Sequence, residues 1–127
     1  MMIEHFYGKE QCNQLDEITT VLQKRTDKEV NEFIIYGQTE FPCMMVLVNK
    51  EYACLHYLDE EGSPGFRSLG DCANLDEEGS SVFYTNTDTE EIWEENLAVV
   101  PFSTALLAVQ EFFQTGAIPT CIEWDEL

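Results

Sequence analysis

The stretch VVPFSTALLAVQEFFQTGAIPTCIEWDEL, residues 99–127, predicts how the chain folds at its C-terminal end. Its apolar residues recur at the spacing of a helix that packs one face on a core. These residues are Ala105, Ala108, Val109, Phe112 and Phe113. Ser103 or Thr104 is expected to cap the start of this helix. Gly116 suits a left-handed position just after its end, and Pro119 prevents it from continuing.

Upstream of this helix the pattern is mostly that of short strands. A second helix is expected over residues 13–24, where acids come early and bases late, as the helix dipole favours. The candidate strands are residues 2–7, 33–36, 43–48, 52–58, 66–69, 81–85 and 121–124. Residues 49–50 are typical of a hairpin turn, whereas residues 87–96 are expected to form a loop or an irregular turn of helix.

These elements predict one domain, residues 1–127, because a chain of this length suits a single hydrophobic core. Its expected class is α+β. The expected architecture is an antiparallel β-sheet of about five or six strands packed with two main helices.

The charge of the chain is strongly negative and unevenly distributed. Six Lys and Arg residues oppose 25 Asp and Glu residues, for a net charge of −19. Residues 29–127 hold only Lys50 and Arg67 against 20 of those acids. Such a surface repels nucleic-acid phosphates and anionic membranes and attracts a basic partner. We therefore expect no direct binding of nucleic acid or membrane, and a basic protein as the partner.

The cysteines and the N-terminus indicate a cytoplasmic protein. The number of cysteines, five, is odd, and no two have C-x-x-C spacing, so neither a set of disulfides nor a zinc site is indicated. Free, mostly buried thiols are therefore expected. They are Cys12, Cys43, Cys54, Cys72 and Cys121. Residues 1–11 lack the basic and apolar regions of a signal peptide. The longest apolar run, residues 43–48, is too short to span a bilayer.

Few residues suggest chemistry. Cys54 and His56 would point to the same face of a strand, as half of a metal site would require. No second pair at ligand spacing completes such a site, and His5 is the only other histidine. A core thiol beside a half-buried imidazole is the plainer interpretation. The acid runs also lack the spacing of a calcium-binding loop.

Known catalytic motifs do not fit the sequence. Pro42-Cys43 resembles the start of the P-C-x-x-C element of zinc nucleotide deaminases, but position 46 is Val46 and no H-x-E occurs. Nucleophile-elbow and phosphate-binding loop motifs do not occur either. We therefore expect no catalysis, no cofactor and no metal ion.

Acidic clusters and aromatic residues occur together in the middle of the chain. The clusters are Asp59-Glu60-Glu61, Asp76-Glu77-Glu78 and the acids of residues 88–95, and the aromatics near them are Phe66, Tyr84 and Trp93. Interfaces favour aromatic anchors surrounded by charges. Solvated loops and a partner-binding face both remain open as interpretations. Arg67 is expected to pair with a nearby acid, and Trp124 to pack on the core.

Residues 100–124 follow the pattern V-P-x-x-x-A-x-x-A-x-x-x-F-F-x-T-G-x-x-P-x-x-x-x-W. This pattern resembles the C-terminal signature of the first-numbered immunity family of bacterial polymorphic toxin systems. Members are small α+β proteins encoded beside toxins, frequently nucleic-acid deaminases. The matching residues are Val100, Pro101, Ala105, Ala108, Phe112, Phe113, Thr115, Gly116, Pro119 and Trp124. Ile118 stands where the family often has a basic residue. Because the matching residues have folding roles, the signature indicates the scaffold and not the binding site.

The resemblance implies an immunity protein that binds and neutralises a cognate toxin in the cytosol without catalysing a reaction. The expected toxin is basic and acts on nucleic acid, as a cytosine deaminase does. The residues expected to bind it are Asp59, Glu60, Glu61, Phe66, Asp76, Glu77, Glu78, Tyr84, Trp93, Glu94 and Glu95. Two alternatives remain: an acidic nucleic-acid mimic that inhibits other DNA-binding proteins, and a small enzyme with a scattered site at His56 and Cys54. One tight partner would favour immunity, whereas many basic partners would favour the mimic.

Overall fold

The computed structural model describes residues 1–70, 74–86 and 88–127. Asp71 and Cys72, from the second acidic loop, and Thr87 lie outside the described residues. The helices are α1 (Leu15–Leu22) and α2 (Phe102–Thr115), and a short 3₁₀ turn covers Asn96–Ala98. The strands are β1 (Met2–His5), β2 (Gly8–Gln11), β3 (Val30–Tyr36), β4 (Cys43–Asn49), β5 (Tyr52–Leu58), β6 (Phe66–Leu69), β7 (Ser80–Thr85), β8 (Glu90–Glu95), β9 (Val99–Pro101) and β10 (Glu123–Glu126).

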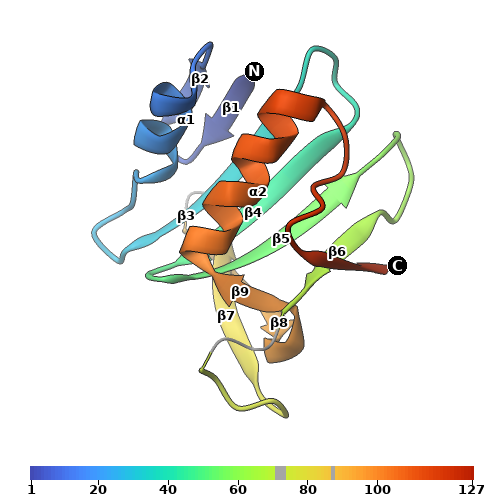
Figure 1. Ribbon diagram of the computed structural model, residues 1–127. Helices are drawn as coiled ribbons and strands as arrows, with labels where there is room; N and C mark the ends of the chain where they lie inside the picture. Colours follow the sequence, from blue (N-terminus) through green and yellow to red (C-terminus); the bar gives the residue numbers. More distant parts are fainter. Residues whose placement is uncertain (71–73, 87) are drawn as a thin grey trace.

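The α+β class and the two helices are confirmed, but the expected number of strands is too low. Eight strands form the main sheet, in the order β10-β6-β5-β4-β3-β1-β2, with β9 paired to part of β5 (Figure 1). The strands β7 and β8 form a separate two-stranded sheet. All these pairings are antiparallel.

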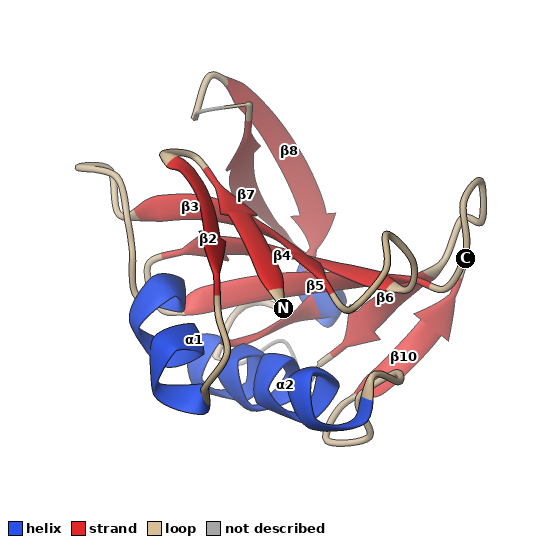
Figure 2. Ribbon diagram, turned by 90° about the horizontal axis from the view of Figure 1, so that it is seen from above, coloured by secondary structure: helices blue, strands red, loops and turns tan. Residues whose placement is uncertain are grey.

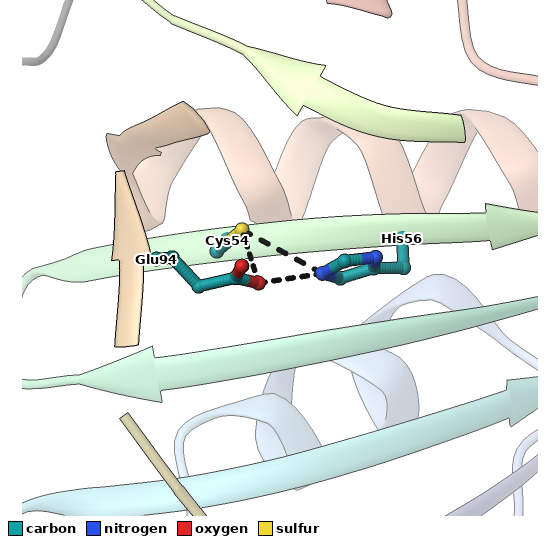
Figure 3. A group of neighbouring side chains, drawn as sticks. All are labelled: Cys54, His56 and Glu94. Carbon is teal, nitrogen blue, oxygen red and sulfur yellow. Dashed lines mark hydrogen bonds and ion pairs between the residues drawn. The ribbon is translucent and has the colours of Figure 1, made fainter. Parts of the chain in front are cut away.

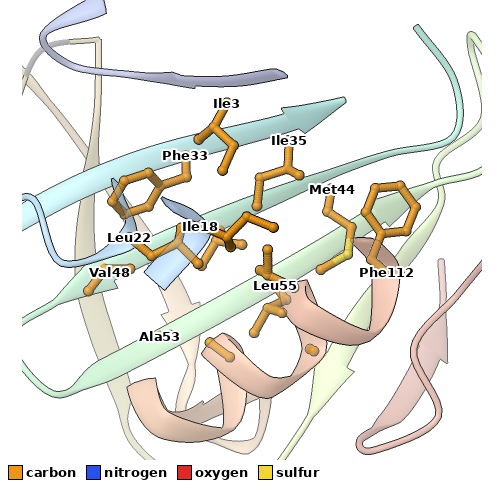
Figure 4. Close-up of a cluster of buried hydrophobic side chains, with 14 of the residues drawn as sticks. Ile3, Ile18, Leu22, Phe33, Ile35, Met44, Val48, Ala53, Leu55 and Phe112 are labelled. Carbon is orange, nitrogen blue, oxygen red and sulfur yellow. The ribbon is translucent and has the colours of Figure 1, made fainter. Parts of the chain in front are cut away.

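The fold has three layers. Figure 2 shows α1 and α2 on one face of the main sheet and the β7–β8 hairpin on the opposite face. The helix face carries the larger core, in which Phe33, Leu55 and Phe112 are fully buried between sheet and helices (Figure 4). The opposite face carries a smaller core, in which Phe83 of β7 packs with Leu47 and Val99. The hairpin is therefore fixed to the sheet by its own apolar side.

The apolar stripe of α2 packs as expected. Ala105, Ala108, Val109 and Phe112 are buried, and Phe113 is partly buried against the same core. The expected capping is wrong at the N-terminal end, because α2 begins directly after Pro101 with no side-chain cap. Strand β9 leads straight into the helix at this point, so its pairing with β5 positions the first turn.

Residues 87–96 differ most from expectation. Instead of a loop or helical turn, this segment forms β8, which pairs with β7 along its whole length. The strand expected over residues 2–7 is shorter than predicted, because β1 ends at His5. The chain then turns back and pairs with it as β2, a strand that the sequence did not predict. The hairpin turn expected at residues 49–50 lies one residue later, at Lys50 and Glu51, because Asn49 still pairs with Tyr52. Lys50 has a positive φ of 58°.

Replacing Gly116 with alanine is expected to lower the free energy of unfolding by about 1 kcal/mol. Gly116 ends α2 at a φ of 68°, and its N–H donates to the carbonyl of Phe112. An added Cβ would meet nothing within 4 Å, so the cost comes from the backbone conformation alone. Urea denaturation checks this result, with Ala117→Gly, at the next exposed position, as the control. An alanine variant as stable as the parent would contradict it.

No described helix is long and apolar enough to cross a membrane.

Candidate binding face and the polar cluster beneath it

The β7–β8 hairpin has one inward and one outward face. On β8, Ile92 and Glu94 point toward the main sheet, whereas Glu91, Trp93 and Glu95 are exposed. This alternation follows from the two-residue period of a strand. The predicted irregular segment is thus a regular strand whose outward residues are acids and a tryptophan.

The partners of β8 on β7 complete the outer face. Trp93 lies opposite Val82, and Glu91 lies opposite Tyr84, so these side chains share one surface. Trp93 is 60% exposed, a large apolar side chain with no partner to cover it among the described residues. We call the surface formed by Val82, Tyr84, Glu91, Trp93 and Glu95 the hairpin face.

The second acidic loop is fixed beside the base of this hairpin. Asn96 follows β8, and its side-chain amide donates to the carbonyl of Asp76 at 2.7 Å. The N–H of Asn96 donates to the carbonyl of Gly79, and its side-chain oxygen accepts from Ser81. Asp76, Glu77 and Glu78 are exposed. The loop therefore adds its three acids to the end of the hairpin where β7 begins.

The charge around the hairpin face is almost entirely negative. Residues 76–95 contain eight acids, and residues 68–127 contain neither lysine nor arginine. Two bases from elsewhere reach the hairpin: Lys28 lies 3.9 Å from Asp88, and Arg67 lies 3.6 Å from Glu95. Most of the carboxylates there are left without a cation among the described residues.

The first acidic cluster lies elsewhere. Asp59, Glu60 and Glu61 are exposed on the β5–β6 loop, which is well separated from the hairpin (Figure 1). Phe66, at the end of that loop, packs against Tyr57 on the helix side of the sheet, with ring centroids 6.3 Å apart. The structure therefore divides the expected binding residues into two separate surfaces, and Phe66 supports the core more than it offers an anchor.

Glu94 is placed differently from the other acids expected to bind the partner. Its side chain is 7% exposed and reaches from β8 to the main sheet (Figure 3). There its Oε2 lies 2.6 Å from Nε2 of His56 and 3.1 Å from Sγ of Cys54. Glu94 is thus a correction to the expected surface, because its carboxylate faces inward.

Arg67 of β6 completes this polar cluster. Its Nη1 lies 3.6 Å from Oε1 of Glu94, which confirms the expected pairing of Arg67 with an acid. Its Nε is buried and makes no hydrogen bond to a described residue. Strands β5, β6 and β8 thus meet through polar side chains, beside the small apolar core that holds the hairpin.

The cluster stabilises Glu94 as a carboxylate. Burial by itself raises the pKa of Glu94, but hydrogen bonds from His56 and Cys54 and the charge of Arg67 lower it below its ordinary value. Burial and the neighbouring carboxylate raise the pKa of the Cys54 thiol well above its usual range. The thiol and the imidazole N–H therefore both donate to Oε2 of Glu94 in this arrangement.

The model of the family described as Immunity protein Imm1 matches residues 13–126. The chain belongs to this immunity protein family. A comparison with curated proteins gives no match. The suspected family is thereby confirmed, and the match extends far beyond the C-terminal signature to nearly the whole chain. Membership of Imm1 supports an immunity role and implies a cognate toxin as partner.

Two residues of the hairpin face of this Imm1 protein were not among the residues expected to bind the toxin. Glu91 was assigned only to an acidic cluster, and Val82 was not singled out, although they lie beside Tyr84 and Trp93. Asn96, which fixes the acidic loop to the hairpin, was not expected either. The alternation of Glu91, Trp93 and Glu95 with Ile92 was the available signal, because it has the period of a strand. Trp124 was expected to pack on the core, and it is partly buried against the helix-side core. Its indole N–H donates to the carbonyl of Pro119.

Proposed function

We propose that this Imm1 protein binds and neutralises its cognate toxin in the cytosol by covering a basic substrate groove with the hairpin face. The observation that carries this proposal is Trp93, which is 60% exposed among carboxylates in a region without lysine or arginine. An exposed tryptophan is a frequent anchor in protein interfaces, and clustered acids match a basic surface.

The proposed toxin is a nucleic-acid deaminase that acts on cytosine. Any enzyme that binds DNA or RNA needs positive charge to hold the phosphates. An acidic protein can occupy such a groove without resembling the substrate in shape. Among enzymes that act on nucleic acid, deaminases are favoured because the C-terminal signature resembles that of a family often encoded beside deaminase toxins. No catalytic step by the immunity protein itself is needed, because occupying the groove excludes the substrate.

The acids and the tryptophan have different roles in this mechanism. Long-range attraction between the acidic surface and a basic toxin accelerates association, and added salt weakens that attraction. The buried contact of Trp93 and Tyr84 then slows dissociation and discriminates among toxins. We expect affinity to fall with salt mainly through the association rate.

The proposal is tested with the toxin domain encoded beside this protein. Calorimetric titration at two salt concentrations should give tight one-to-one binding that salt weakens. Deamination of cytosine in single- and double-stranded DNA should stop at an equimolar amount of the immunity protein. Binding without loss of deamination would refute groove covering, and similar binding to many unrelated basic proteins would favour a nucleic-acid mimic.

Reversing the charges beside the hairpin should slow association with the toxin by about tenfold to 100-fold at low salt. The variant carries Glu77→Lys, Glu78→Lys and Glu91→Lys, all exposed residues. Stopped-flow measurements of the association rate check the result.

The matched control reverses three exposed acids on the separate β5–β6 loop: Asp59→Lys, Glu60→Lys and Glu61→Lys. Both variants change the net charge of the protein by the same amount. If both slowed association equally, the effect would come from net charge, and the hairpin face would not be the docking surface.

A further inference from the structure

Cys54, His56 and Glu94 bring a sulfur, a nitrogen and an oxygen ligand atom to one point between β5 and β8. We propose that these three side chains bind a divalent transition-metal ion of the zinc class. This inference does not depend on the toxin or on the proposed function. Among the described residues, this is the one group of three such side chains whose ligand atoms lie within 4.8 Å of one another.

The nitrogen and the sulfur both lie close to one carboxylate oxygen of Glu94. Oε2 of Glu94 lies 2.6 Å from Nε2 of His56 and 3.1 Å from Sγ of Cys54, and the sulfur and nitrogen are 4.0 Å apart (Figure 3). A tetrahedral zinc ion with ordinary bond lengths separates such atoms by about 3.4–3.6 Å. Each separation therefore has to change by less than about 1 Å to admit the ion.

The chemistry of the donors fits zinc. Zinc accepts a thiolate, an imidazole and a carboxylate together, whereas magnesium and calcium require oxygen ligands alone. The thiolate of Cys54 and the carboxylate of Glu94 would also balance the two positive charges of the ion. His56 and Cys54 lie two residues apart on β5, so one strand holds two ligands at a fixed spacing.

Arg67 does not block the proposed site. Its Nη1 faces Oε1 of Glu94, the oxygen opposite to the one that His56 and Cys54 contact. Carboxylates that bind metals are commonly held by such a second partner, which fixes their orientation. Oε2 remains directed toward the sulfur and the nitrogen.

The proposed site is reached by water on the side of His56. The side chain of His56 is 17% exposed, so the cluster is not sealed from water. Three protein ligands leave one tetrahedral position for a water molecule. Binding would displace the thiol proton of Cys54 to solvent, and the Nε2 proton of His56 would leave or move to Nδ1.

His5 provides a natural comparison elsewhere in the chain. Its Nε2 lies 2.7 Å from Oε2 of Glu10, the same histidine–carboxylate pairing as in the cluster. Lys24 lies 3.2 Å from that same oxygen of Glu10. This pair should not bind zinc, because no thiolate joins it and the ammonium group of Lys24 already contacts the carboxylate oxygen that would bind the ion.

The test uses cobalt, whose bond to a thiolate gives a charge-transfer absorption band. Cys121 is exposed and Cys72 lies outside the described residues, so both are first replaced by serine and neither can contribute a thiolate. Adding cobalt to the chelator-treated protein should produce the band with a one-to-one endpoint. Zinc should then abolish the band and raise the melting temperature of the protein.

Substitutions assign the band to the cluster. Cys54→Ser should abolish it, and His56→Gln should weaken cobalt binding at least tenfold, whereas His5→Gln should change neither. A parent protein that gives no band with a tenfold excess of cobalt would overturn the proposal, as would a band that persists in Cys54→Ser. If Cys54→Ser does not fold, as judged by circular dichroism, unchanged cobalt affinity in both His56→Gln and Glu94→Gln would overturn it.

Discussion

Replacing Trp93 with alanine is expected to weaken toxin binding about 100-fold, equivalent to about 2.7 kcal/mol. The side chain is 60% exposed in the free protein and lies at the centre of the hairpin face, beside Val82. Its removal costs the complex a large apolar contact, while the fold loses little. Most of the effect should appear in the dissociation rate, measured by surface plasmon resonance.

Leu107 provides the matched control for this experiment. It is 58% exposed, but it lies on α2, on the side of the sheet opposite to the hairpin. Leu107→Ala therefore removes a comparably exposed apolar side chain without touching the hairpin face. Toxin affinity that falls in the Leu107 variant but not in the Trp93 variant would place the interface on the helices.

The parts of the fold that could be predicted from sequence are those with continuous apolar patterns. The bounds expected for β5 and β6 are those observed, and β4 differs by one residue. The apolar stripe of α2 also predicted which face of that helix is buried. In each case the side chains that stabilise the element also identify it, because apolar burial dominates the energy.

The strands β2 and β8 could not be recognised in the same way. Strand β2 has the sequence GKEQ and lies at the edge of the sheet, where few of its side chains meet the core. On β8, one inward position is Glu94, whose carboxylate is buried against His56 and Cys54, 38 and 40 residues earlier in the chain. Because Glu94 is a carboxylate, Ile92 is the one apolar residue on the inward side of β8, so the strand period in this segment was only a weak signal.

The candidate binding site was only half predictable for a related reason. Asp59-Glu60-Glu61 and Asp76-Glu77-Glu78 are alike in composition, and both are exposed loops. Only tertiary contacts, above all the hydrogen bond from Asn96 to Asp76, place the second cluster beside the base of the hairpin. Composition indicates that a surface is acidic, but the pairing of distant segments decides which acids act together.

Replacing Glu94 with alanine is expected to lower the free energy of unfolding by about 3–5 kcal/mol. Its buried carboxylate accepts from His56 and Cys54 and faces Arg67, so the variant loses these interactions and leaves the guanidinium without its buried partner. Glu94→Gln keeps an oxygen acceptor of the same shape, so it should lose only about 1–2 kcal/mol. Chemical denaturation in the presence of a chelator measures both losses without a contribution from bound metal.

The same pair of variants distinguishes a supporting role for Glu94 from direct contact with the toxin. Its side chain faces the main sheet, so removing its charge should leave the outer surface of the hairpin unchanged. Glu94→Gln should therefore bind the toxin within about threefold of the parent, because the variant remains folded and Trp93 stays in place. Glu95 is 69% exposed on the other face of the same strand. A folded Glu94→Gln variant that lost more affinity than Glu95→Gln would contradict this expectation. Glu94 would then have to turn outward when the toxin binds, and its buried position would describe the free protein alone.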